Sequence, residues 1–251
     1  MVLPDVAKPP KSPKDIPTIE ELYYTGLRLE QFYNPSFDPV PYYLEALRRD
    51  PENYRVNTAL GLMNLRNGIF DRAEEYLQTA VRRITHNHTK PRDGEAYYYL
   101  GLCQKYTGRH QEAYKNFYQA TWNQAFHSAA YYQLAELACM KEDFTEALEH
   151  LERSLSTNIN HTRASNLRAA VLRRLGDMET ALALTREVRE SDPLDFWSLC
   201  EQYFVLQEAG REQEASRALR LLKEGMHGYD QSYLCLLYTS PSPRDRTRPR
   251  M

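Results

Sequence analysis

The sequence is poor in glycine, in closely spaced cysteine and in long apolar runs. It has 10 glycines and no P-loop, G-x-G-x-x-G or G-x-S-x-G motif, so the common phosphate-binding and hydrolase signatures are excluded. Its four cysteines form no CxxC pair, which argues against a disulfide framework or a zinc knuckle. No stretch approaches the roughly 20 consecutive apolar residues of a membrane span, and the N-terminus has no apolar signal core. We therefore expect a cytoplasmic, non-catalytic protein without membrane contact, metal or cofactor.

Charge of neither sign dominates the chain. The formal net charge is −2, but residues 235–251 contain four arginines and one aspartate, a net of +3, so the rest of the chain stands at −5. A nucleic-acid groove needs clustered Lys and Arg to neutralise phosphates. The moderately acidic body therefore disfavours nucleic acid as a partner.

A short phrase centred on alanine does recur along the chain. It appears as FDRAEEYLQTA, HQEAYKNFYQA, FTEALEHLERS, METALALTREV and EQEASRALRLL. The alanines are Ala73, Ala113, Ala147, Ala181 and Ala215, separated by steps of 40, 34, 34 and 34 residues. Self-similarity at a fixed period is the signature of a repeat architecture.

The phrase and its period resemble the tetratricopeptide repeat (TPR), which is 34 residues long and runs W-x2-L-G-x2-Y, then A-x3-F, then P. Leu60 with Gly61 and Leu100 with Gly101 occupy the leucine and glycine positions of that pattern. Turns between paired helices are expected at Gly68, Gly108, Glu142-Asp143, Gly176-Asp177 and Gly210. The resemblance implies an all-α fold, a TPR superhelical solenoid of antiparallel helix pairs with about five to six repeats.

Close packing of the paired helices explains why small residues recur. Small side chains allow two backbones to approach, and large ones fill the space beside them. We expect Gly101 and Ala113 to face one another across a hairpin, with Tyr97, Leu100 and Phe117 packed around them.

The repeat register divides the chain into three parts. We assign residues 1–18 to a disordered linker, residues 19–228 to the TPR array and residues 229–251 to a truncated end with an artefactual tail. The repeats are expected near residues 20–53, 54–87, 94–127, 128–161, 162–195 and 196–228. The first is degenerate, with a proline-rich turn, NPSFDPVP, and the step of 40 residues places an inserted loop at His86 to Gly94.

The last seventeen residues have an unusual origin in this interpretation. CLLYTSPSPRD, residues 235–245, resembles the translation of a transposon-end sequencing adapter. The natural protein would then continue past Leu234 with other residues. The alternative is a disordered basic tail rich in Ser, Pro and Arg.

First helices of successive TPR repeats line a groove, and residues at i, i+4 and i+7 share one helix face. On this spacing the candidate partner-binding residues are Tyr24, Arg28, Gln31, Thr58, Leu62, Leu65, Tyr98, Leu102, Lys105, Tyr132, Glu136, Cys139, Asn166, Ala170 and Arg173. An aromatic groove of mixed charge suits a peptide or a partner helix. The alternative is that the tyrosines only cover neighbouring helices.

The chain also contains side chains of the types that bind metal ions. His86, His88 and Asp93 include common metal ligands, but they belong to the inserted loop and no histidine pair at helical spacing supports them. We interpret this loop as solvated.

A second resemblance concerns the tyrosine-rich run DGEAYYYLGLCQKYTGRHQEAYKNFYQATWNQAFHSAAYYQLAEL. It is similar to the TPR region of bacterial proteins that carry the domain of unknown function 5107, whose context links them to carbohydrate metabolism. The resemblance implies an accessory region of a longer protein, with any active site upstream. The first hypothesis remains a scaffold that holds a peptide or protein; a helical-repeat RNA reader is disfavoured by the acidic body.

Overall fold

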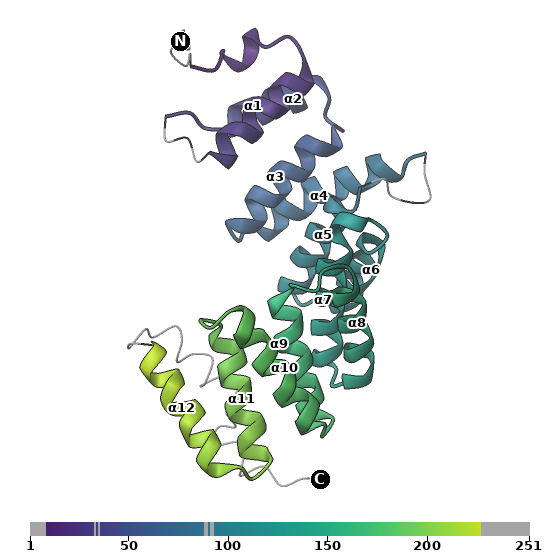
Figure 1. Ribbon diagram of the computed structural model, residues 1–251. Coiled ribbons are helices and arrows are strands. Elements are labelled where there is room, and N and C mark those ends of the chain that lie inside the picture. Colours follow the sequence, from purple (N-terminus) through teal and green to yellow (C-terminus); the bar gives the residue numbers. More distant parts are fainter. Residues whose placement is uncertain (1–8, 33, 35, 88–89, 91–92, 227–251) are drawn as a thin grey trace. The chain divides into compact units, whose positions relative to one another are not determined.

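The computed structural model describes residues 9–32, 34, 36–87, 90 and 93–226. Those residues form a short 3-10 helix and twelve α-helices, with no strand among them (Figure 1). The chain divides into two compact units, Met1–Ala130 and Tyr131–Met251, which are described separately. The division falls inside helix α7, Gln124–Met140.

Unit 1 contains three successive helix pairs and the start of α7. After the 3-10 helix η1 (Pro13–Asp15) come α1 (Ile19–Gln31), α2 (Val40–Arg49), α3 (Tyr54–Arg66), α4 (Phe70–Thr85), α5 (Glu95–Tyr106) and α6 (His110–Ala120). Each first helix contacts its own second helix, and α1, α3 and α5 also contact one another in sequence.

Unit 2 repeats this arrangement from the remainder of α7 onward. Its helices are α8 (Phe144–Thr157), α9 (Thr162–Arg174), α10 (Met178–Ser191), α11 (Phe196–Glu208) and α12 (Glu212–Met226). Helix α9 packs on α10, and α11 packs on both α12 and α9. The predicted fold class, an all-α array of antiparallel helix pairs, is confirmed.

The turns inside the pairs fall where the sequence places them. Four of them carry a glycine with positive φ, and the fifth has Glu142 at φ 61°. After two of these turns an aspartate caps the next helix: Asp143 accepts from the Glu146 amide at 3.0 Å, and Asp177 from the Thr180 amide at 3.2 Å. The four glycines are Gly68, Gly108, Gly176 and Gly210.

Glu142 offers a direct test of this turn chemistry. A residue with a Cβ is strained in the left-handed region, which glycine adopts freely. We expect Glu142→Gly to raise the free energy of unfolding by about 0.5 to 1 kcal/mol, after allowing for the greater entropy of glycine in the unfolded chain. Urea denaturation followed by circular dichroism measures the change. Gly108→Ala should shift the midpoint the opposite way, and a loss of stability in Glu142→Gly would contradict the explanation.

Helical glycines let paired helices approach closely. A Cβ built on Gly101 would lie 2.7 Å from ring atoms of Phe117, which is fully buried. The predicted packing of Phe117 at Gly101 is therefore confirmed, and the atoms nearest to Gly101 belong to Phe117 and not to Ala113. The same relation recurs in the other pairs of unit 1, Gly26 against Tyr43 and Gly61 against Leu77.

The core of each unit lies between the helices of a pair and between successive pairs. In unit 1, Leu22, Tyr43 and Val56 bring α1, α2 and α3 into one buried cluster. In unit 2, Phe204 and Leu222 belong to a cluster formed by residues of α9 to α12. None of the helices that the structure describes is both long and apolar enough to cross a bilayer.

Part of the predicted disordered linker, residues 1–18, is ordered. From residue 9 onward it follows a defined path in which Ile16 is only 2% exposed. Arg49 donates to the Ile16 carbonyl at 2.7 Å, and the Tyr42 hydroxyl donates to another carbonyl of the segment at 3.0 Å. Burial of an apolar side chain together with these bonds explains why this part packs on α2. Residues 1–8 lie outside the described residues.

Two other sequence predictions fall partly or wholly outside the described residues. The inserted loop between α4 and α5 includes the undescribed residues 88–89 and 91–92. His88, one of the three candidate metal ligands, therefore lies outside the described residues. The proposed artefactual tail lies wholly within the undescribed residues 227–251.

Candidate functional site

The first helices of unit 1 enclose a hollow of about 350 Å³. Helix α3 lies between α1 and α5 in the order of contacts, so one face of each helix contributes to it. Its lining residues are Tyr23, Leu27, Glu30 and Gln31 of α1, Arg55, Ala59, Leu62 and Arg66 of α3, and Glu95 and Tyr99 of α5. A smaller hollow of about 280 Å³ shares Tyr23 and Arg55 and extends the surface toward the start of α1 and α3.

Two of the four charged groups in the larger hollow neutralise each other. Arg66 pairs with Glu30 at 2.8 Å, and the Tyr43 hydroxyl donates to the other Glu30 oxygen at 3.2 Å. Arg55 is directed to groups at the rim, with Glu20 at 3.6 Å and the Tyr54 hydroxyl at 3.3 Å. The arginines therefore already have partners within the chain.

Glu95, the first residue of α5, is different. Burial raises the pKa of its carboxyl, and the nearby charges of Asp93 and Glu30 raise this pKa further. Within the described part of the chain, its carboxylate has no hydrogen-bond or ion-pair partner. The hollow thus contains a half-buried acid whose charge is not balanced by a neighbouring base.

Two of the three predicted candidates on α1 lie outside this hollow. Tyr24 is 52% exposed and Arg28 is exposed, but neither lines the hollow, whereas their neighbours Tyr23 and Leu27 do. The small position is Gly26, although residue 27 is the one that lies 34 positions before Gly61. Gly26 precedes its contact residue Tyr43 by 17 residues, whereas Gly61 precedes Leu77 by 16. Of the three candidates on α1, Gln31 alone lies in the hollow.

On α3 the candidates divide between the hollow and the core. Leu62 lines the hollow. Thr58 is buried and donates to the Tyr54 carbonyl at 2.7 Å, and Leu65 is buried in a core cluster. Thr58 and Leu65 therefore pack inside the array rather than facing a partner.

The candidates on α5 do not line the hollow either. The Tyr98 ring packs against Phe117 and Phe126, with ring centroids 5.8 and 5.4 Å apart. Lys105 is half-buried and outside the hollow. For Tyr98 the alternative reading, a tyrosine that covers neighbouring helices, matches the structure.

The candidates in unit 2 take structural positions. Tyr132 is buried and donates to the half-buried Glu136 at 3.3 Å. Asn166 is fully buried and donates to Asp195 at 2.8 Å. Arg173 forms ion pairs with Glu201 and Glu208 of α11, so its guanidinium holds two helices together.

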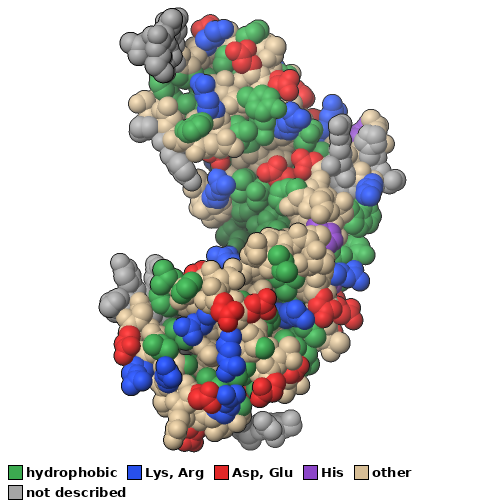
Figure 2. All heavy atoms as spheres, viewed as in Figure 1, with side chains coloured by type: hydrophobic (Ala, Val, Ile, Leu, Met, Phe, Trp, Pro, Cys, Tyr) green, Lys and Arg blue, Asp and Glu red, His purple; other side chains and the backbone are tan. Residues whose placement is uncertain are grey.

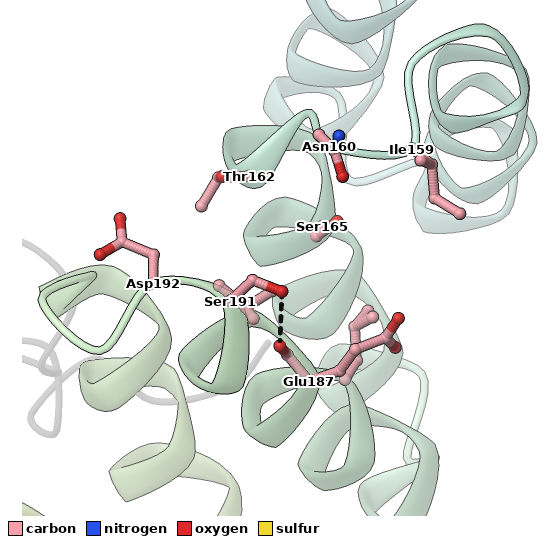
Figure 3. A pocket seen from close by; sticks show the side chains of 9 residues that line it. Ile159, Asn160, Thr162, Ser165, Glu187, Ser191 and Asp192 are labelled. Atoms are coloured by element: carbon pink, nitrogen blue, oxygen red, sulfur yellow. Dashed lines mark hydrogen bonds between the residues drawn. The ribbon is translucent and has the colours of Figure 1, made fainter.

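Unit 2 has a larger hollow, of about 460 Å³, on different helices (Figure 3). It lies at the turn before α9 and along α10, the second helix of its pair. Its polar groups are partly used within the chain, because the Ser191 hydroxyl donates to the Glu187 carbonyl at 3.4 Å and Asp192 accepts from the Leu194 amide at 3.1 Å. We therefore regard the hollow of about 350 Å³ in unit 1, which contains the unpaired Glu95, as the better candidate site.

The distribution of surface charge agrees with a binding site that contains both acidic and basic side chains. Figure 2 shows Lys and Arg side chains interspersed with Asp and Glu side chains on the visible face of each unit, with no basic stripe. Among the described residues, no group of His, Cys, Asp and Glu has the arrangement of a metal site.

Comparison with known families agrees with the helix-pair architecture. Residues 132–196 match the family described as tetratricopeptide repeat. This segment therefore carries tetratricopeptide repeats. Residues 37–137 match a second family, described as the TT21 fifth ARM repeats domain. Both descriptions are of helical repeats, and in this TPR chain the helices of residues 37–137 pair two by two around Gly61 and Gly101.

Several solved structures have the same fold. PilW, described as a widely conserved type IV pilus biogenesis factor, is 15% identical, covers 87% of this chain and 98% of its own, and has a TM-score of 0.72. PilF of Pseudomonas aeruginosa is 18% identical over 88% of this chain and 97% of its own, with a TM-score of 0.71. YrrB, described as a TPR protein with an unusual peptide-binding site, is 18% identical over 78% and 97%, with a TM-score of 0.59. At these identities the similarity establishes the fold.

Proposed function

We propose that this TPR chain is a non-catalytic scaffold that binds an extended peptide or a partner segment along the first helices of unit 1. The observation that carries the proposal is the hollow formed jointly by α1, α3 and α5. Leu27, Ala59 and Leu62 provide apolar contact there, beside two tyrosines and four charged side chains. An apolar lining with a few polar groups is the usual composition of a recognition site.

The size and shape of the surface favour a peptide over a small metabolite. The two adjoining hollows share residues and continue over several helices, whereas a small-molecule site is commonly one enclosed pocket. YrrB, which has the same fold, is described as having a peptide-binding site, and this precedent supports the proposal without assigning the same ligand.

A random dodecapeptide library displayed on phage, selected against the purified 251-residue chain, tests the proposal. Selected peptides, resynthesised with a fluorescent label, should bind in anisotropy titrations. Leu62→Lys should weaken their binding by about tenfold or more, because it places a charge in the apolar part of the hollow. Circular dichroism verifies that the variant remains folded.

Leu44→Lys is the matched control for that experiment. Leu44 lies on α2, is 49% exposed and is outside both hollows of unit 1. The same substitution there should leave binding unchanged. Failure to select any peptide, or an equal loss in both variants, would refute the groove.

A second candidate function rests on the tyrosine-rich run from residue 93 to residue 137. Its resemblance to the TPR region of bacterial proteins with the domain of unknown function 5107 supports an accessory role in a longer protein linked to carbohydrate metabolism. Sequencing the parental gene tests it: a β-patterned domain upstream in the same reading frame is expected, and an unrelated upstream sequence would reject the idea.

A further inference from the structure

Glu95 lies in a hollow that is only partly balanced in charge. Glu30 already has Arg66 at 2.8 Å, and Arg55 is directed to Glu20 and Tyr54 at the rim. The Glu95 carboxylate, half-buried at the start of α5, has no hydrogen-bonding or ionic partner in the described ranges. Burial of an unpaired carboxylate costs free energy that a cationic ligand would recover.

Burial and the surrounding charges both affect the pKa values of the two tyrosines in the hollow. Burial raises the pKa of Tyr23, and among the nearby charges Glu95 raises this pKa more than Arg55 lowers it. Burial likewise raises the pKa of Tyr99, with Glu95 as the next cause, ahead of the lowering effect of Arg66. For both tyrosines the effect of Glu95 on the pKa exceeds that of the neighbouring arginine.

We propose that Glu95 is the anchor for a lysine or arginine side chain of the bound peptide, with Tyr23 and Tyr99 beside it. This inference rests on the proposed peptide-binding function and states which kind of peptide side chain the hollow binds. A carboxylate in a partly desolvated hollow forms a stronger charge-assisted hydrogen bond than one in water. Tyrosine rings near the cation can add cation–π attraction, and the aliphatic stem of a basic residue can pack on Leu27, Ala59 and Leu62.

The test uses the peptides selected from the phage library on the intact chain. We expect a lysine or arginine at one common position of the selected sequences. Replacing that residue by norleucine should weaken binding to the wild-type chain by about tenfold or more, since the ion pair is lost. The basic peptide and its norleucine variant should bind Glu95→Gln with affinities that differ by less than about twofold. The carboxylate that pairs with the basic side chain is absent from this protein variant.

Glu75→Gln is the matched control. Glu75 is exposed on α4 and outside the hollow, so this variant should retain the full lysine-to-norleucine effect. Peptides without a common basic residue, or an exchange effect of equal size in wild type and Glu95→Gln, would overturn the anchor while leaving peptide binding intact. Selection of no peptide by the wild-type chain would overturn the proposed function and the anchor together.

Discussion

Removing the guanidinium of Arg173 is expected to lower the free energy of unfolding by about 3 to 5 kcal/mol, because it leaves a buried charge without its partner. Glu201 is only 3% exposed, and Arg173 of α9 pairs with it and with Glu208 on α11. In Arg173→Ala the Glu201 carboxylate would stay buried and unpaired. Urea denaturation of the purified chain, followed by circular dichroism, measures the loss.

The pH dependence separates lost charge pairing from lost packing. Burial raises the pKa of Glu201, and Arg173 acts in the opposite direction. Without Arg173 the pKa should rise further. A carboxyl with a raised folded-state pKa favours folding while it is protonated, and this contribution is lost as the pH rises through the raised value. The deficit of Arg173→Ala should therefore be smaller at about pH 5 than at about pH 7.5.

An exposed pair in the same unit supplies the control for this prediction. The Arg211 guanidinium and the Glu214 carboxylate lie 2.7 Å apart at the surface, near the start of α12. Arg211→Ala should leave the unfolding midpoint nearly unchanged, because water screens and solvates both charges. A deficit of Arg173→Ala that is independent of pH would indicate that packing, and not the charge on Glu201, explains the effect.

Replacing Gly101 by leucine is expected to cost about 1 to 3 kcal/mol of stability, since the added side chain overpacks a filled core. Even its Cβ would approach the Phe117 ring to 2.7 Å, and that ring is fully buried between α5 and α6. The change in the urea midpoint measures the cost.

Two further variants make the Gly101 prediction specific. Gly101→Ala combined with Phe117→Leu should be more stable than Gly101→Ala alone, because repeat 4 already has Ala135 and Leu151 in one buried cluster at the corresponding positions. Lys115→Ala, an exposed change on α6, should have little effect. An unchanged midpoint in Gly101→Leu would mean that the helices are not in close contact at this position.

The helix pairs and their turns could be predicted because the residues that determine them are close together in the sequence and recur in each repeat. A glycine or an acidic residue about five positions before each repeated alanine marks a helix end, and Gly68 and Gly108 show the expected positive φ. The small position at Gly101 could be recognised for the same reason, since only a small residue permits the close approach that the period implies.

The binding surface was less predictable because it depends on the register of each helix. Tyr24 precedes Thr58 by the repeat length of 34 residues, but the small residue of α1 is Gly26, one position before the residue that this period gives, and Tyr23 and Leu27 line the hollow instead. The position of Gly26 relative to Tyr43 carries this information, because it identifies the face that meets α2. Period counting alone could not find Glu95, which faces α1 and α3 from the first turn of α5.

The sequence by itself determined that this chain forms repeated helix pairs, where each pair turns and which small residues allow close packing. These features follow from backbone conformation and periodicity, which act over a few residues. Only the tertiary structure decided which polar side chains remain available. Asn166 and Arg173 were predicted to face a partner, yet Asn166 bonds to Asp195, which caps α11, and Arg173 pairs with Glu201 of α11. Burial and pairing depend on neighbours distant in sequence, so the contacts between repeats settled them.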